Sequence, residues 1–120
     1  MADRVIFISW GQVVRGREEI ALENFNETIG LYGQMQQDGR IEGFDVALLN
    51  PSTGMDGYIA IKGSAEQLAA LKEAEDYQTA LAGASLIVDD LKVADGFTNE
   101  GIAPQMAIYT EAVSKVPQAH

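Results

Sequence analysis

Side chains that carry out nucleophilic or acid–base chemistry are scarce in this sequence. It contains no cysteine, and its one histidine, His120, is the last residue, in a segment expected to fray. A serine nucleophile needs a histidine beside it, and thiolate chemistry needs a cysteine. The sequence therefore excludes Ser-His-Asp and Cys-His catalysis, disulfides, and metal sites that use cysteine or several histidines.

Carboxylates are the remaining candidates for acid–base or metal chemistry. Asp89 and Asp90 are adjacent in a predicted strand, so they would point to opposite faces and could not share one substrate. A lone buried base at either position is the alternative. Glu73, Glu75 and Asp76 form an acidic junction that we interpret as solvated and helix-capping. The sequence has no EF-hand pattern and no glycine-rich phosphate loop, and we expect no metal and no cofactor.

Length and charge limit the class of partner. The chain has 120 residues, with 8 Lys and Arg against 18 Asp and Glu, and a formal net charge of −10. This length favours one domain. The acidic balance argues against nucleic acid and against an anionic membrane surface. No stretch is long enough for a membrane-spanning helix or a signal peptide, and we expect a cytoplasmic protein.

Four strands are predicted from β-branched and aromatic runs, over residues 5–10, 41–50, 57–62 and 84–93. The first has no polar alternation before Ser9, which predicts a strand that is covered on both faces. The second and third are separated by turn-forming residues over 50–57, which predicts a hairpin.

Helical spacing and capping residues predict three helices, over residues 17–38, over 64–83 in two pieces, and over 101–116. Ser64 and Gln67 form a capping box at the start of the broken helix. Asp76 can cap its second piece, and Asn99 can cap the last helix.

The first and last helices each carry one apolar stripe. The first has Ala21, Phe25, Ile29, Tyr32 and Met35 and ends at Asp38-Gly39; the last has Ile102, Met106, Tyr109, Val113 and Val116. Gly30 and Gly33 interrupt the first helix. Two interpretations stay open: a narrow face that a backbone or ligand approaches, or a helix that is merely suboptimal.

The order of elements is β-α-β-β-α-β with a further helix, the split βαβ arrangement. Its crossovers place both long helices on one face of a four-stranded antiparallel sheet. The other face is predicted to be apolar, because in either orientation the outward sets include Phe7, Val46, Leu49, Ile59, Ile61, Leu86 or Val88. Monomers rarely expose so large an apolar surface, so we predict a homodimer that packs sheet face on sheet face. A monomer with an exposed apolar face is the alternative.

In element order, in the strands over 5–10 and 84–93, and in the broken helix over 64–83, the chain resembles the dimeric α/β barrel superfamily across residues 3–97. The resemblance implies a ferredoxin-like α+β fold for residues 1–97. Residues 98–120 would be a helical extension that packs on the domain or on the partner subunit. Members include cofactor-free antibiotic-biosynthesis monooxygenases, muconolactone isomerase-like proteins, YciI-like proteins and haem-degrading enzymes. The fold does not choose among these activities, and the histidines of the last two groups have no counterpart here.

The resemblance also implies a ligand site between the sheet and its own helices. The candidate ligand-binding residues are Phe7, Ser9, Asn24, Phe25, Tyr32 and Tyr58. Antibiotic-type monooxygenases resemble this inventory in using Asn, Trp and Tyr to orient a phenolic substrate that itself reacts with oxygen. Phe7 and Phe25 can also be core residues, and Trp10, on the other face of its strand from Phe7 and Ser9, can anchor a dimer interface.

Three functions follow as hypotheses. The first is a homodimeric protein with a structural role, or one that binds a small apolar or aromatic molecule. The second is a cofactor-independent monooxygenase or isomerase that acts on an aromatic or polyketide-like substrate. The third is a protein–protein adaptor that uses the C-terminal helix. A cavity of about 300 Å³ or more, lined by Tyr58 and Phe25, would favour binding or catalysis, and a filled interior would favour a structural role.

Overall fold

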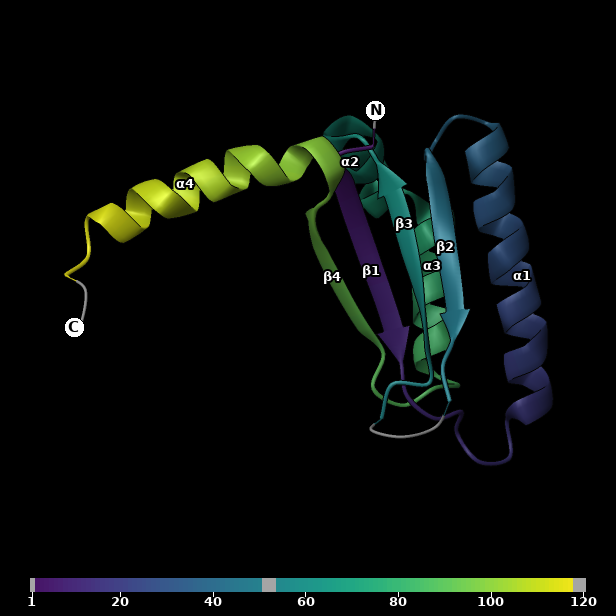
Figure 1. Cartoon of the computed structure of the whole chain (residues 1–120). Coiled ribbons are helices and arrows are strands. Elements are labelled where there is room, and N and C mark those ends of the chain that lie inside the picture. Colours follow the sequence, from purple (N-terminus) through teal and green to yellow (C-terminus); the bar gives the residue numbers. More distant parts are fainter. Residues whose placement is uncertain (1, 51–53, 118–120) are drawn as a thin grey trace.

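The computed structural model describes residues 2–50 and 54–117 (Figure 1). His120 and residues 51–53 of the predicted hairpin turn lie outside these ranges. The elements are β1 (Arg4–Trp10), α1 (Glu18–Gln37), β2 (Gly43–Leu48), β3 (Gly57–Gly63), α2 (Ala65–Glu73), α3 (Glu75–Ser85), β4 (Lys92–Phe97), the 3-10 turn η1 (Asn99–Gly101) and α4 (Ile102–Ser114).

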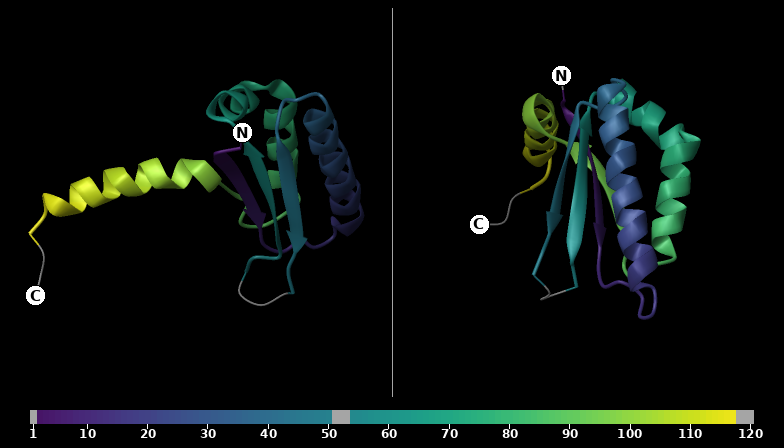
Figure 2. Two further views of the ribbon diagram at one scale, coloured as in Figure 1. Left: turned by 45° about the horizontal axis from the view of Figure 1, so that its top comes forward. Right: turned by 90° about the vertical axis from the view of Figure 1, so that its right-hand side faces the viewer.

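The four strands form one antiparallel sheet in the order β2-β3-β1-β4. Helices α1, α2 and α3 cover one face of this sheet, and the other face is left open (Figure 2). Because α1 connects β1 to β2 and the α2–α3 pair connects β3 to β4, the arrangement is the predicted β-α-β-β-α-β order.

The face of the sheet that meets the helices holds the core. Ile6 lies opposite Ile61, and Ile8 lies opposite Ile59, so these four side chains share that face. They pack with Tyr32 and other buried side chains of the helices, and the innermost residues are Ile6, Tyr32, Met35, Ile41, Ile61 and Leu71. The stripe predicted for the first helix is thus the stripe that α1 buries.

The open face carries the alternate side chains of the same strands. Phe7 and Tyr58 lie there with ring centroids 5.0 Å apart, beside small residues such as Ala60. Near the β2 edge, Lys62 Nζ lies 2.6 Å from Asp45 Oδ2. The prediction of a strongly apolar outer face therefore needs correction. Ile59, Ile61 and Val46 lie on the helix face, while Leu49, Leu86 and Val88 lie outside the strands.

The predicted fourth strand exists, but its predicted span of 84–93 is wrong. Helix α3 continues to Ser85, and β4 begins only at Lys92. The apolar residues between them form the connection: Ile87 is buried, and Val88 pairs with Val13 in an isolated bridge. A short apolar run fits a buried connection as well as a strand, so periodicity alone could not separate the two. Asp89 and Asp90 consequently lie before the strand, and both are exposed.

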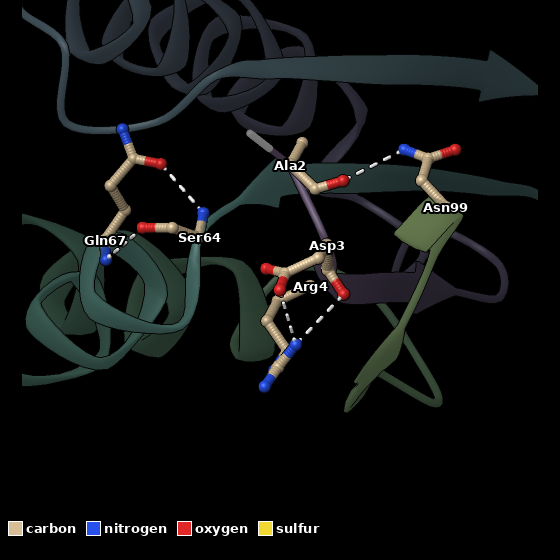
Figure 3. Close-up of polar contacts among 6 residues, drawn as sticks. All are labelled: Ala2, Asp3, Arg4, Ser64, Gln67 and Asn99. Carbon is tan, nitrogen blue, oxygen red and sulfur yellow. Dashed lines mark hydrogen bonds and ion pairs between the residues drawn. The ribbon is translucent and has the colours of Figure 1, made fainter. Parts of the chain in front are cut away.

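The predicted helix ends agree in part with the structure. The capping box is present, with Ser64 N donating to Gln67 Oε1 at 2.8 Å and Gln67 N donating to Ser64 Oγ at 3.1 Å (Figure 3). Gly39, at φ 76°, follows the end of α1 in the left-handed conformation that glycine favours. Asp76 is not the N-cap of α3, because it lies inside the first turn. There its Oδ1 accepts a hydrogen bond from Tyr77 N at 2.8 Å, and its carboxylate also accepts two hydrogen bonds from Arg40.

The structure also tests the hypotheses that Asn99 caps the last helix and that Gly30 and Gly33 form a narrow face of the first helix. Asn99 does not cap the last helix, because its Nδ2 donates to Ala2 O at 3.0 Å (Figure 3). A Cβ atom added at Gly30 or Gly33 would meet nothing within 4 Å. No backbone among the described residues therefore approaches that face of α1, and the narrow-face interpretation loses its support within the chain.

Candidate ligand-binding site

A pocket of about 370 Å³ lies between the sheet and the helices α1 and α3. Ile8 and Trp10 of β1 and Ile59 of β3 form its sheet side. Phe25 comes from α1 and Leu81 from α3, and further apolar residues come from the connection between α3 and β4. The lining is almost entirely apolar, which is typical of a site for an apolar molecule.

Small residues create the room for this pocket. Gly57 lies directly opposite Trp10 in the sheet, and a Cβ atom at Gly57 would lie 2.5 Å from Trp10 Cζ2. The glycine therefore lets the indole lie over β3. Helix α3 presents Ala80 and Ala84 to the pocket, where larger side chains would fill it. The Trp10 ring meets the Phe25 ring edge-on, with centroids 6.2 Å apart.

Few polar groups reach the pocket, and most of them come from α1. Asn24 and Thr28 line it and can donate or accept hydrogen bonds. Glu18 lies among the lining residues, and its carboxylate accepts hydrogen bonds from Gly16 N at 2.9 and 3.2 Å. The described lining includes no lysine, arginine or histidine. The pocket thus offers no positive charge to an anionic ligand.

Tyr32 also lines the pocket. Its side chain is 1% exposed, and its ring lies 5.9 Å from that of Phe44. Burial raises the pKa of the Tyr32 phenol well above its usual range, and the nearby Tyr77 phenol and Asp76 carboxylate raise it further. Tyr32 is therefore a neutral phenol near pH 7, able to donate a hydrogen bond but not to act as a base.

The structure divides the six candidate residues into two groups. Asn24, Phe25 and Tyr32 line the pocket. Phe7, Ser9 and Tyr58 lie on the open face of the sheet, so they cannot contribute to the same site in one subunit. Prediction placed them with the helices, and this was wrong.

The sequence does contain information on which strand face meets the helices. Tyr58 and Ala60 alternate onto the same face as Lys62, and a lysine favours the solvent-facing side. Trp10, which was predicted to anchor a dimer interface, lines the pocket instead. The residues from the end of α3 and from the connection after it were missed because that segment was predicted to be a strand.

An outer groove of about 620 Å³ adjoins the pocket. It runs between α1 and α3, and Asn24, Thr28 and Ala80 line both hollows. Glu27 and Glu75 line its outer part and make it acidic. The pocket and the groove therefore border each other at these three residues.

Two other kinds of site were sought over residues 2–50 and 54–117. Within these ranges, no group of three or more His, Cys, Asp or Glu side chains is arranged to hold a metal ion. In the same part of the chain, no helix combines the length and the apolar composition that crossing a bilayer requires.

Comparison with solved structures bears on the fold. A dimeric protein of unknown function and ferredoxin-like fold from Bacteroides fragilis aligns with a TM-score of 0.57 at 11% identity, over 79% of this chain and 96% of that chain. An antibiotic biosynthesis monooxygenase-like protein from Chloroflexus aurantiacus aligns with a TM-score of 0.51 at 16% identity, over 82% of this chain and 95% of that chain. The chain has a ferredoxin-like fold.

At these identities the likeness shows the fold and leaves the activity of this ferredoxin-like domain open. No protein-family model matches the chain, and no curated protein matches it by sequence. The candidate site must therefore be interpreted from its own geometry and chemistry.

Proposed function

We propose that this chain is a homodimeric protein that binds a small, uncharged aromatic molecule between its sheet and the helices α1 and α3. The observation that carries the proposal is the pocket of about 370 Å³ with a nearly apolar lining. Its size falls within the range of roughly 300–1,000 Å³ that is usual for small-molecule sites. The interior of a protein with only a structural role would instead be packed by side chains as densely as a crystal of small organic molecules.

The side chains of the pocket favour a flat, neutral ligand. Trp10 and Phe25 offer aromatic surfaces against which a planar ring can pack. Asn24 and Thr28 can hydrogen-bond to a carbonyl or hydroxyl at one edge of the ligand. Glu18 and the net charge of −10 would repel a carboxylate or sulfonate.

The homodimer is supported by the open face of the sheet. Phe7 and Tyr58 form an aromatic pair there, which a second copy would cover in an isologous contact. The Bacteroides fragilis neighbour is itself dimeric. In this arrangement the open face serves assembly and the helix face serves the ligand.

A cofactor-independent monooxygenase is a second candidate function. It is favoured by the convergence of Trp10, Asn24 and Tyr32 on one pocket, because antibiotic-type monooxygenases use these residue types. The Chloroflexus aurantiacus neighbour is monooxygenase-like. A hydroxynaphthalene would supply the electrons, one oxygen atom entering the ring and the other leaving as water. Oxygen uptake with 1-naphthol above the uncatalysed rate, lost in Asn24→Ala, would support this activity.

The binding proposal can be tested through the single tryptophan. Because Trp10 is the only tryptophan of the chain and lines the pocket, its fluorescence reports directly on occupancy. We propose a titration with 1,4-naphthoquinone, a neutral quencher that finds no thiol to modify in this cysteine-free chain. Saturable quenching and a raised melting temperature are expected. The charged analogue 1,4-naphthoquinone-2-sulfonate should bind at least about tenfold more weakly than 1,4-naphthoquinone.

Matched variants locate the site. Ala84→Leu, inside the pocket, should weaken naphthoquinone binding by about tenfold or more. Ala82→Leu, on the exposed side of α3, should change the dissociation constant for naphthoquinone by less than about twofold. Linear quenching equal to that of free tryptophan amide, with no change in melting temperature, would refute the proposal.

A further inference from the structure

Helix α4 leaves the domain as an exposed apolar arm. It runs away from the sheet beyond the β4 edge (Figure 1). None of its residues is buried, and Ile102, Met106 and Tyr109 are 48, 54 and 63% exposed. An isolated helix of this length is marginal in water, so its stability depends on packing against something.

The composition of α4 does not fit a solvated helix. Its thirteen residues include one charged side chain, Glu111. Ile102, Met106 and Tyr109 recur at steps of four and three and share one face. A helix with so few charges is normally buried.

The base of the arm is fixed to the start of β1. Thr98 N donates to Asp3 O at 3.1 Å, and Asn99 Nδ2 donates to Ala2 O at 3.0 Å (Figure 3). A Cβ atom at Gly101 would lie 2.3 Å from Asp3 O, so the chain passes this point in close contact. These contacts set the direction in which α4 departs. It lies on the side of the sheet opposite to α1 and α3, the side of the open face (Figure 2, right).

We propose that α4 docks on a second copy of this chain, each subunit giving its arm to the other about a two-fold axis. The inference rests on the homodimer of the proposed function and adds a second surface to it. Charge permits this partner, because α4 carries one acid and therefore places little like charge at the contact between two chains of net charge −10.

The area that a stable dimer needs also favours an exchanged arm. Four strands of six or seven residues present roughly 20 Å by 19 Å of flat surface, or about 400 Å². Stable interfaces bury about 800 Å² on each partner. An arm of thirteen residues is about 20 Å long and 10 Å wide, and each subunit both gives and receives one. The exchange therefore brings the contact close to the needed size.

The first test compares charges placed on two faces of α4. Met106→Asp with Tyr109→Asp puts two charges on the apolar face, and Ala103→Asp with Ala107→Asp puts two on the other. Sedimentation equilibrium should show that the first pair raises the dimer dissociation constant at least about tenfold. The second pair should leave this constant within about threefold of the wild-type value. Equal constants for the two pairs would overturn the proposal, provided that circular dichroism shows both variants folded.

A sheet-face variant separates this inference from the dimer on which it rests. Tyr58→Asp should also weaken the dimer. If Tyr58→Asp weakens it and the arm pair does not, the sheet-face dimer stands and the arm proposal falls. A wild-type chain that stays monomeric over a roughly thousandfold range of concentration would contradict both. Neither result depends on the ligand titration.

The second test asks which copy the arm contacts. Because the chain has no cysteine, Ala107→Cys gives one site for a nitroxide label. A labelled, unenriched copy is mixed with an unlabelled ¹⁵N copy until subunits exchange. Broadening of amide signals in the ¹⁵N copy is expected. Broadening seen only when the label and ¹⁵N are in the same chain would show that α4 folds onto its own domain, and would refute the exchange.

Discussion

The two faces of the sheet differ in what lies beside their aromatic rings. On the helix face, Ile6, Ile8, Ile59 and Ile61 pack with the helices, and the aromatic rings of Trp10 and Phe25 border a pocket. On the open face, the rings of Phe7 and Tyr58 pack against each other at 5.0 Å. Both faces therefore carry paired aromatic rings, and the pocket beside Trp10 and Phe25 distinguishes the helix face from the open face.

The helix face itself differs from end to end. Near α2, the core is filled by large side chains such as Leu68 and Leu71, which are 4 and 2% exposed. Near the far end of α3, the corresponding positions are Ala80 and Ala84, and the pocket opens there. The first end is thus a filled core, and the second end holds the pocket for which we propose a ligand.

The largest expected effect is on the free energy of unfolding, and it distinguishes a core position from a position on the open face. Ile61→Ala should lower the free energy of unfolding by about 3 kcal/mol relative to wild type, because it leaves a cavity at a fully buried position. This difference should not depend on protein concentration. Phe7→Ala, on the open face, should lower the free energy of unfolding more at protein concentrations where the proposed dimer forms than at concentrations where the chain is monomeric. Urea unfolding at two concentrations measures both, and a Phe7→Ala cost that is independent of concentration would remove the contrast.

The next effect tests how the pocket is built. Gly57→Ala places a Cβ atom 2.5 Å from Trp10 Cζ2, so the indole must move. We expect a loss of stability of about 1–2 kcal/mol and a shift in Trp10 emission. The control is Gly43→Ala, another strand glycine, where an added Cβ meets nothing within 4 Å. An unchanged emission spectrum in Gly57→Ala would mean that Gly57 does not hold the indole in place.

The smallest effect concerns alkaline pH. The pKa of the Tyr32 phenol is raised by burial, so the unfolded chain releases this proton at lower pH than the folded chain does. Stability should be unaffected below about pH 10 and should then fall by at most about 1.4 kcal/mol per pH unit from this group. Tyr32→Phe should make the decline shallower in unfolding experiments at pH 9 to 11.5 or so. An identical slope in the variant would contradict the burial of this phenol.

Much of the fold could be predicted because its elements carry local patterns. The stripe of α1, the capping box at Ser64 and the terminal helix all appear in the sequence and in the structure. The span of β4 could not be predicted in the same way. Its strand, Lys92–Phe97, contains lysine, aspartate and glycine, while the more apolar segment before it closes the core as a connection. Tertiary packing decided between the two segments.

The candidate site could be predicted only from the helix side. Asn24, Phe25 and Tyr32 were predicted because the family resemblance implied a ligand site between the sheet and the first helix, and all three line the pocket. The strand residues were assigned to the wrong face, because each strand has apolar residues on both sides and a change of face exchanges every side chain. The unfilled space itself depends on which small residues meet across α1, α3 and β3, and no local pattern encodes that meeting.

The separation of the two faces can be tested in one NMR titration. A single tryptophan gives a single indole N–H signal, which reports on the pocket, and the amides of Phe7, Tyr58 and Ala60 report on the open face. With 1,4-naphthoquinone at constant protein concentration, the indole signal should shift while those amides stay in place. On dilution without ligand, the amides should shift and the indole should not. Naphthoquinone that shifts the open-face amides and leaves the indole signal unchanged would contradict the account.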